Sequence, residues 1–187
     1  MSDFVKSKAR PEVFTLDAYV PGKPIDEVKR ELGLDDIIKM ASNENPLGPS
    51  PQAVEAVTAS LPHMHIYPDA NCFDLKQRLA AVYKLESENV LLGNGSDEVL
   101  TMLATAFLEP GDQIVYGSPT FSQYKFVAKV MGAETAAVPL YNYTYDLDAI
   151  LKAIHDNTKM VFICNPNNPT GTIVDQRAMD RFMDIVS

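Results

Sequence analysis

The chain has 187 residues, of which 46% are hydrophobic and 22% charged, a composition typical of a globular domain. Its formal net charge of −9 at pH 7 argues against nucleic-acid binding, which usually requires a basic face. No apolar run is long enough to span a membrane, and residues 1–10 lack the apolar segment of a signal peptide. The two cysteines, Cys72 and Cys164, are far apart in sequence and indicate a reducing, cytoplasmic compartment.

The first 72 residues are predicted to lie outside the main domain. Residues 1–35 contain prolines and scattered apolar side chains, a pattern that predicts an N-terminal arm lying on another surface. Residues 36–72 are predicted to form a small-domain or linker segment that begins with a short strand at 36–41. Within this segment, Ser50 and Pro51 mark the start of a helix, because proline is favoured at the first helical position.

Residues 73–187 alternate between helical and strand patterns. Helices are predicted over 73–84, from 96, over 121–131 and 146–154, and from 175; strands are predicted at 90–92, 113–116, 133–139 and 159–164. This alternation predicts an α/β fold, a largely parallel sheet flanked by helices. The last helix reaches Ser187 without a C-terminal Gly or Pro, so we expect a truncated chain, the N-terminal part of a longer enzyme.

The most informative segment is residues 159–171, in which an apolar strand runs into a turn of Asn, Pro and Gly. The run 160–164 predicts a parallel strand that is buried on both faces. Pro166 and Pro169 exclude helix at the residues before them, so the asparagines lie on a rigid bend at the carboxyl end of the strand. Ligands of open α/β sheets bind at that edge, where a side-chain amide can donate a hydrogen bond at a fixed angle.

Two further loops follow predicted strands. Residues 93–98 read Gly-Asn-Gly-Ser-Asp-Glu and open a helix, whose N-terminal N–H groups favour an anion. Glu98 stands where a dinucleotide fingerprint has its third glycine, and no P-loop lysine follows, so a single phosphate fits better than a pyrophosphate. Phe121, in the second loop, is placed either to stack on a planar ring or to pack in the core. A phosphate cradle, an aromatic plate and an amide donor together suit a phosphorylated aromatic cofactor such as pyridoxal 5'-phosphate.

Five motifs make the chain similar to a known family: residues 19–23, 42–48, 67–69, 93–98 and 165–171. The chain resembles the fold-type I pyridoxal-phosphate aminotransferases of class I/II, most closely the histidinol-phosphate aminotransferases, over the first half of such an enzyme. The resemblance implies an incomplete major domain of that fold, and a cytoplasmic homodimer as the whole enzyme. It implies amino transfer between histidinol phosphate, in histidine biosynthesis, and 2-oxoglutarate.

The resemblance also implies which residues bind the cofactor. Gly95, Ser96 and Asp97 would hold its phosphate. Phe121 would stack on its pyridine ring, and Asn168 would donate a hydrogen bond to the phenolic oxygen of the ring.

Three further residues have roles implied by the resemblance. Tyr67 would reach across the dimer interface to the partner's cofactor phosphate. Tyr19 and Asn43 would line the entrance for the substrate.

Other groups that the family uses have no counterpart in the chain. The family has a Schiff-base lysine, an aspartate at the pyridine nitrogen and an arginine for the substrate carboxylate, all after the Asn-Pro-Thr-Gly turn. After Gly171 the chain has no lysine, and we interpret Lys152 and Lys159, which precede the turn, as solvated surface charges. No catalytic residue is therefore assigned, and the 187-residue chain by itself is expected to be inactive.

Other functions are open at the level of sequence. A lyase similar to threonine-phosphate decarboxylase, or an aromatic or broad-specificity aminotransferase, would share these motifs. A non-catalytic fragment of the same fold that acts in binding or dimerisation is a third possibility. His63 and His65 form a His-x-His pair, but no third ligand is evident beside them, so no metal is expected.

Overall fold

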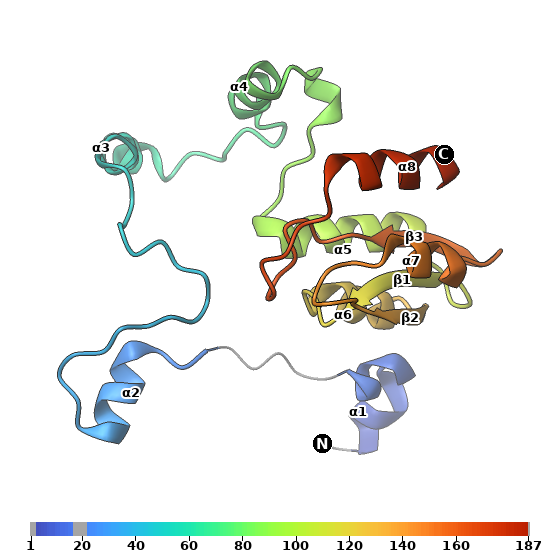
Figure 1. The fold of residues 1–187 in the computed structure, drawn as a ribbon. Coiled ribbons are helices and arrows are strands. Elements are labelled where there is room, and N and C mark those ends of the chain that lie inside the picture. The colour runs from blue at the N-terminus through green and yellow to red at the C-terminus, as the bar shows by residue number, and fades with distance from the viewer. Residues whose placement is uncertain (1–2, 17–21, 187) are drawn as a thin grey trace. The chain divides into compact units, whose positions relative to one another are not determined.

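The computed structural model describes residues 3–16 and 22–186 (Figure 1). These residues belong to two units. The first contains the N-terminal segment and everything from Leu91 onward, and the second contains the segment that ends at Val90. Over these two ranges, no helix is long and apolar enough to cross a membrane.

The first unit is built on a parallel sheet of three strands in the order β2-β1-β3. The strands are β1 (Gln113–Ser118), β2 (Glu134–Pro139) and β3 (Thr158–Phe162). β1 lies in the middle, where Ile114 and Val115 are fully buried. A short apolar run with a neighbour on each side is the usual pattern of a central parallel strand.

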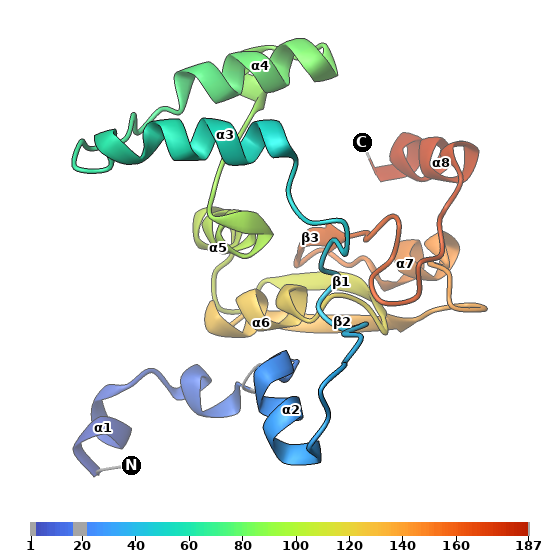
Figure 2. The same cartoon turned by 90° about the vertical axis from the view of Figure 1, so that its left-hand side faces the viewer.

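Helices cover both faces of this sheet. The helices on one face are α5 (Gly95–Phe107) and α6 (Gln123–Val130), and those on the other are α7 (Leu147–Ala153) and α8 (Gln176–Val186) (Figure 2). The chain changes face between α6 and α7, and the sheet therefore has a core on each side. The predicted α/β fold, with a parallel sheet flanked by helices, is confirmed.

Alternation along β1 explains how one strand serves two cores. Ile114 and Tyr116 pack with Val127 of α6, whereas Val115 packs with Ile150 of α7 and Phe182 of α8. Successive side chains of a strand point to opposite faces, so an uninterrupted apolar run buries side chains on both.

Two helices on the second face follow Asp146 and Asp175, the positions from which the sequence predicted helices. The side chain of Asp146 accepts a hydrogen bond from the Ala149 N–H at 2.9 Å, and that of Asp175 accepts one from the Ala178 N–H at 2.8 Å. Each carboxylate satisfies an N–H group that has no partner within the helix.

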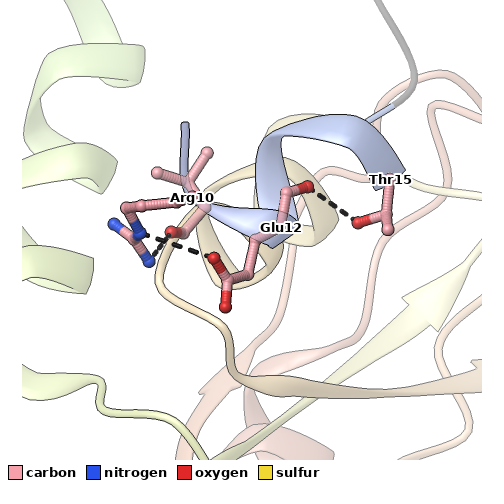
Figure 3. Close-up of polar contacts among 4 residues, drawn as sticks. Arg10, Glu12 and Thr15 are labelled. Carbon is pink, nitrogen blue, oxygen red and sulfur yellow. Dashed lines mark hydrogen bonds and ion pairs between the residues drawn. The ribbon is translucent and has the colours of Figure 1, made fainter. Parts of the chain in front are cut away.

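The N-terminal segment lies against the C-terminal end of α6. It contains α1 (Asp3–Lys8) and the 3₁₀ helix η1 (Pro11–Thr15). The Arg10 guanidinium donates to the carbonyl of Val130 at 2.6 Å and lies 3.5 Å from the carboxylate of Glu12 (Figure 3). Lys129 Nζ in turn donates to the carbonyl of Thr15 at 3.1 Å. These contacts join the start of the chain to the sheet-bearing unit.

The second unit is helical over its described residues and buries little. Its helices are α2 (Ile25–Leu32), α3 (Pro51–Ser60), η2 (Leu61–His63), α4 (Phe73–Tyr83) and η3 (Ser87–Asn89). Of residues 22–90, only Ala80 is buried. The helices expected from Pro51 and over 73–84 are confirmed, whereas α2 was not predicted. The division of the chain into an arm, a linker and a large domain stays a prediction.

Three details differ from the sequence expectations. No strand forms at 36–41 or 90–92, because short apolar runs become strands only where a neighbouring strand offers hydrogen bonds. α5 begins at Gly95 rather than being capped by Ser96. β3 is half-buried rather than buried on both faces, since it pairs with β1 on one side only in the described sheet.

Candidate functional site

A pocket of about 740 Å³ opens where the carboxyl end of the sheet meets the start of α5. Its lining includes Gly95, Ser96, Phe121, Tyr124, Cys164 and Asn168. All of these residues belong to the first unit. Four of them, from three separate loops, were predicted from the sequence to bind one ligand, namely Gly95, Ser96, Phe121 and Asn168.

The start of α5 supplies the polar end of the pocket. Gly95 has a φ of +79°, which favours glycine, and a Cβ added there would meet nothing within 4 Å. Its own N–H donates to the carbonyl of Gly93 at 2.8 Å. The carboxylate of Glu98 accepts from the backbone and side chain of Asn94. The helix N–H groups left for an anion are therefore those of Ser96 and Asp97.

Aromatic rings form one wall of the pocket. The ring of Phe121 meets the ring of Tyr124 edge-on, with centroids 5.7 Å apart and planes at 84°. Tyr124 in turn stacks on Phe162 of β3 at 4.6 Å and 11°. Burial, and to a smaller extent the nearby Cys164, raises the pKa of the Tyr124 hydroxyl well above its usual range.

Asn168 presents an amide to the pocket. Its backbone N–H donates to Cys164 Sγ at 3.4 Å. Its half-buried side chain has no hydrogen-bond partner among residues 3–16 and 22–186. Because its amide is accessible and has no partner in the described part of the protein, this side chain is suited to bind a polar atom of a ligand.

Asn167 has a different role, which the sequence did not reveal. Its side chain is 3% exposed, and its carbonyl oxygen accepts from the Thr120 hydroxyl at 2.7 Å. Its NH₂ group donates to the Pro119 carbonyl at 3.2 Å and to the Thr170 hydroxyl at 2.7 Å. The amide thus joins the Phe121 loop to the Asn168 loop. The repeated asparagines of this turn predicted a bend, but the sequence does not indicate which of their side chains is buried.

The other predicted site residues do not line this pocket. Asp97 follows Ser96 in α5 but is not in the lining. Tyr67, which is 98% exposed, and Asn43 belong to the second unit. Tyr19 lies outside the described residues.

Neither lysines nor metal ligands gather in the described part of the site. Lys152 and Lys159 are exposed, and Lys159 Nζ lies 3.9 Å from Asp112, so their interpretation as surface charges is confirmed. No lysine lines the pocket in the part of the chain that the structure describes. Over the same residues, no group of three or more His, Cys, Asp or Glu side chains could hold a metal ion. A second pocket, of about 480 Å³, lies beside α7 and α8 and contains none of the predicted residues.

The sequence of this chain matches a known family and several curated proteins. The sequence model described as "Aminotransferase class I and II" matches residues 35–187. The chain is 53% identical over 176 residues to the histidinol-phosphate aminotransferase of Moorella thermoacetica, covering 94% of this chain and 46% of that protein. It is 47% identical over 185 residues to histidinol-phosphate aminotransferase 2 of Pseudomonas aeruginosa, covering 98% and 50% respectively.

Two solved structures are similar to this one. The Sinorhizobium meliloti histidinol-phosphate aminotransferase, solved with pyridoxal-5'-phosphate, has a TM-score of 0.85 and 23% identity, over 97% of this chain and 48% of its own. The Clostridium acetobutylicum histidinol-phosphate aminotransferase has a TM-score of 0.69 and 27% identity, over 78% of this chain and 42% of its own.

The chain spans about half the length of the curated relatives that it matches. The matched segment, residues 35–187, nevertheless contains every residue that lines the pocket. On this match, the chain belongs to the class I and II aminotransferases.

Proposed function

We propose that the whole protein is a pyridoxal-phosphate-dependent histidinol-phosphate aminotransferase, which moves an amino group between histidinol phosphate and 2-oxoglutarate. The observation that carries this proposal is the meeting of three loops around one pocket, with helix N–H groups, an aromatic ring and a free amide. The relatives with that name, up to 53% identical, support the choice of substrate.

The residues of the pocket fit the cofactor. The N–H groups of Ser96 and Asp97 suit a phosphate, because the start of a helix favours an anion. Phe121 offers a ring for stacking, and the free amide of Asn168 offers a donor for the phenolic oxygen. The size also fits, since a pocket of about 740 Å³ is in the range of small-molecule sites.

Each of these residues has a defined task in the proposed reaction. When bound, pyridoxal phosphate supplies an electron sink for amino transfer. Phe121 would stack on the ring, and Asn168 would stabilise negative charge on its oxygen through a hydrogen bond. The N–H groups at the start of α5 would hold the phosphate. No lysine of the described residues reaches the pocket, so covalent attachment is assigned to none of them.

The proposal extends to the assembly of the whole protein. We propose a cytoplasmic homodimer in which Tyr67 contacts the partner's cofactor phosphate, and an entrance for the substrate that is lined by Tyr19 and Asn43. The exposure of Tyr67, at 98%, supports a role in contacts outside its own unit. Asp97 is retained as a phosphate ligand through its backbone N–H. The domain proposal is an arm at 1–35, a small-domain or linker segment at 36–72 and part of a large domain at 73–187.

The test uses the complete gene product, purified with pyridoxal phosphate. We expect formation of glutamate from histidinol phosphate and 2-oxoglutarate. The Asn168→Ala variant should bind the cofactor at least about 10-fold more weakly, because it loses a hydrogen bond to a charged oxygen. The Asn157→Ala variant, which changes an exposed asparagine outside the pocket lining, is the matched control.

Two results would contradict the proposal. A product that binds no pyridoxal phosphate would remove the cofactor assignment. A product that binds it but releases carbon dioxide from threonine phosphate, without transferring an amino group from histidinol phosphate, would identify the lyase instead.

A further inference from the structure

Hydrogen bonds between side chains join the three loops that follow β1, β2 and β3. The Tyr145 hydroxyl, in the loop after β2, donates to Thr120 Oγ, in the loop after β1, at 2.9 Å. Thr120 Oγ donates to Asn167 Oδ1 at 2.7 Å, and Asn167 Nδ2 donates to Thr170 Oγ at 2.7 Å, both in the loop after β3. Thr170 Oγ donates to the carbonyl of Tyr143 at 3.0 Å, so this hydrogen-bond network returns to the loop in which it begins.

The protons of the network fix the direction of its bonds. A hydroxyl carries one proton, so Thr120 accepts from Tyr145 and donates its own proton to Asn167. Thr170 likewise accepts from Asn167 and donates to the Tyr143 carbonyl. The removal of one hydroxyl therefore leaves a neighbouring group without its partner, and the effect extends beyond the residue that is changed.

The centre of the network is buried. Tyr145 is 6% exposed and Asn167 is 3% exposed. A Cβ added at Gly117 of β1 would lie 2.7 Å from Cε1 of Tyr145, so this glycine leaves the space that the tyrosine ring occupies. Because water cannot replace a partner that is lost at such a position, each of these bonds is costly to break.

Two members of the network stand next to the proposed cofactor contacts. Thr120 immediately precedes Phe121, and Asn167 immediately precedes Asn168. Phe121 and Asn168 line the pocket, whereas neither Thr120 nor Asn167 is among the described residues that line it. The bond between Thr120 and Asn167 thus joins the two backbone segments that carry the aromatic ring and the free amide. The Gly171 N–H, which donates to the Asn167 carbonyl at 2.7 Å, closes the turn that contains Asn168.

The hydroxyl of Tyr145 is the member of the network that packing alone does not explain. A phenylalanine would fill the same space over Gly117, but it could not donate to Thr120. By donating to Thr120 Oγ, the tyrosine leaves the proton of Thr120 directed at Asn167. A valine at position 120 would have nearly the shape of threonine but could neither accept the first bond nor donate the second.

We propose that Tyr145 and Thr120 are positioning residues, which act through Asn167 to set the orientation of a bound pyridine ring. They do so by keeping the ring of Phe121 and the amide of Asn168 in a fixed relation. This inference rests on the proposed function, because it requires that the pocket binds pyridoxal phosphate. Neither positioning residue is assigned a chemical step.

The experiment measures pyridoxal phosphate binding to the complete gene product and to four variants: Tyr145→Phe, Thr120→Val, Thr120→Ser and the double variant Tyr145→Phe/Thr120→Val. Two quantities are read, the dissociation constant and the visible circular dichroism per bound cofactor at saturation. The dichroism depends on how the cofactor ring is held, and a loss of protein stability alone would not change it.

Two further variants are matched controls. Tyr143→Phe removes an exposed hydroxyl from the same loop and keeps the backbone carbonyl that accepts from Thr170. Thr105→Val changes an exposed threonine of α5, whose hydroxyl donates only within its own helix. Both controls should bind the cofactor as the unmodified protein does.

We expect Tyr145→Phe to weaken binding by about 2- to 10-fold, the effect of one lost hydrogen bond, and to reduce the dichroism. Thr120→Val should weaken binding at least as much, because it removes two bonds of the network. The double variant should be no weaker than Thr120→Val, since the Tyr145 hydroxyl has already lost its acceptor there. Thr120→Ser should retain the affinity and the dichroism of the unmodified protein, because serine keeps the hydroxyl.

The outcomes separate this inference from the proposed function. If the unmodified protein binds pyridoxal phosphate and Tyr145→Phe and Thr120→Val both match it in affinity and dichroism, the positioning role is wrong while the proposed function stands. Multiplicative effects of the two single changes, or weaker binding with unchanged dichroism, would also overturn the positioning role. If the unmodified protein binds no pyridoxal phosphate, both proposals fail.

Discussion

Asn167 and Asn168 are neighbours in the chain, yet their side chains do different work. The amide of Asn167 is buried and makes hydrogen bonds to Thr120, Pro119 and Thr170. The amide of Asn168 is half-buried and makes none with any described residue. A fully bonded amide contributes to stability, whereas a free one in a pocket is available for binding.

This difference predicts that substitutions at the two adjacent positions chiefly change different properties: stability at Asn167 and cofactor binding at Asn168. Asn167→Ala should lower the free energy of unfolding by about 1–3 kcal/mol, because it leaves the buried partners without their hydrogen bonds. Asn168→Ala should change it by less than about 0.5 kcal/mol and weaken cofactor binding instead. Urea unfolding monitored by circular dichroism measures the free energy of unfolding of both variants. Equal destabilisation by the two substitutions would contradict this division of roles.

At the residue scale, the sequence predicted the residues that line the pocket better than the residues that hold them in place. Gly95, Ser96, Phe121 and Asn168 were predicted together, and the structure brings them to one pocket. The supporting role of Asn167 could not be predicted, because its partner Thr120 lies 47 positions away in the chain. Only the folded arrangement of two loops decides which asparagine turns inward.

Helix ends are the next scale at which sequence and structure can be compared. Helices were predicted to begin at Asp146 and at Asp175, and both side chains cap the helices that follow them. The helix α2 was missed, although Pro24 before it and Gly33 after it, at a φ of 64°, are common boundary residues. The strand expected at 90–92 does not form, since a strand depends on a partner that its own residues do not specify.

The end of α6 depends on the N-terminal segment. Arg10→Ala removes the donor to the Val130 carbonyl and should lower the free energy of unfolding by about 0.5–1.5 kcal/mol. Faster hydrogen exchange confined to the last turn of α6 would be the direct sign of this loss. Arg30→Ala, on the exposed surface of α2, is the control and should leave that exchange unchanged. The same exchange rate in both variants would contradict the proposed anchoring.

The start of α4 predicts a pH dependence. The Asp69 carboxylate accepts the N–H groups of Phe73 at 2.8 Å and Asn71 at 2.9 Å, and these bonds lower its pKa below the ordinary value of 3.8. The group therefore stabilises the folded state fully above pH 3.8, and this contribution is lost as the pH falls through the lower, folded-state pKa.

Amide exchange at Phe73 and Asn71 can follow this loss. Both amides should lose protection as the pH falls below 3.8, after correction for the intrinsic exchange rate. In the Asp69→Asn variant, which carries no titrating carboxyl group, the protection should not change over the same range. A carboxyl pKa at or above 3.8 in an NMR titration of Asp69 would show that these bonds do not hold in solution.

At the scale of the whole molecule, the alternation of helices and strands was enough to predict the parallel sheet. One apolar strand, β1, contributes side chains to a core on each side of the sheet, as expected for a parallel strand between two layers of helices. The sequence could not predict how little the second unit buries, because its helices carry apolar side chains that remain exposed, among them Phe73 and Val82. Burial depends on a packing partner, which the helical pattern itself does not supply.

The absence of a lysine from the described pocket gives the last prediction. Residues 1–187 should contribute phosphate, ring and amide contacts but no Schiff base. Borohydride reduction of this chain with stoichiometric pyridoxal phosphate, followed by peptide mapping, should therefore yield only weak labelling spread over exposed lysines such as Lys152 and Lys159. One equivalent of label on a single lysine of this chain would mean that it attaches the cofactor itself. The assignment of only non-covalent contacts to these residues would then be wrong, because a lysine selected among many surface amines must lie against the bound ring.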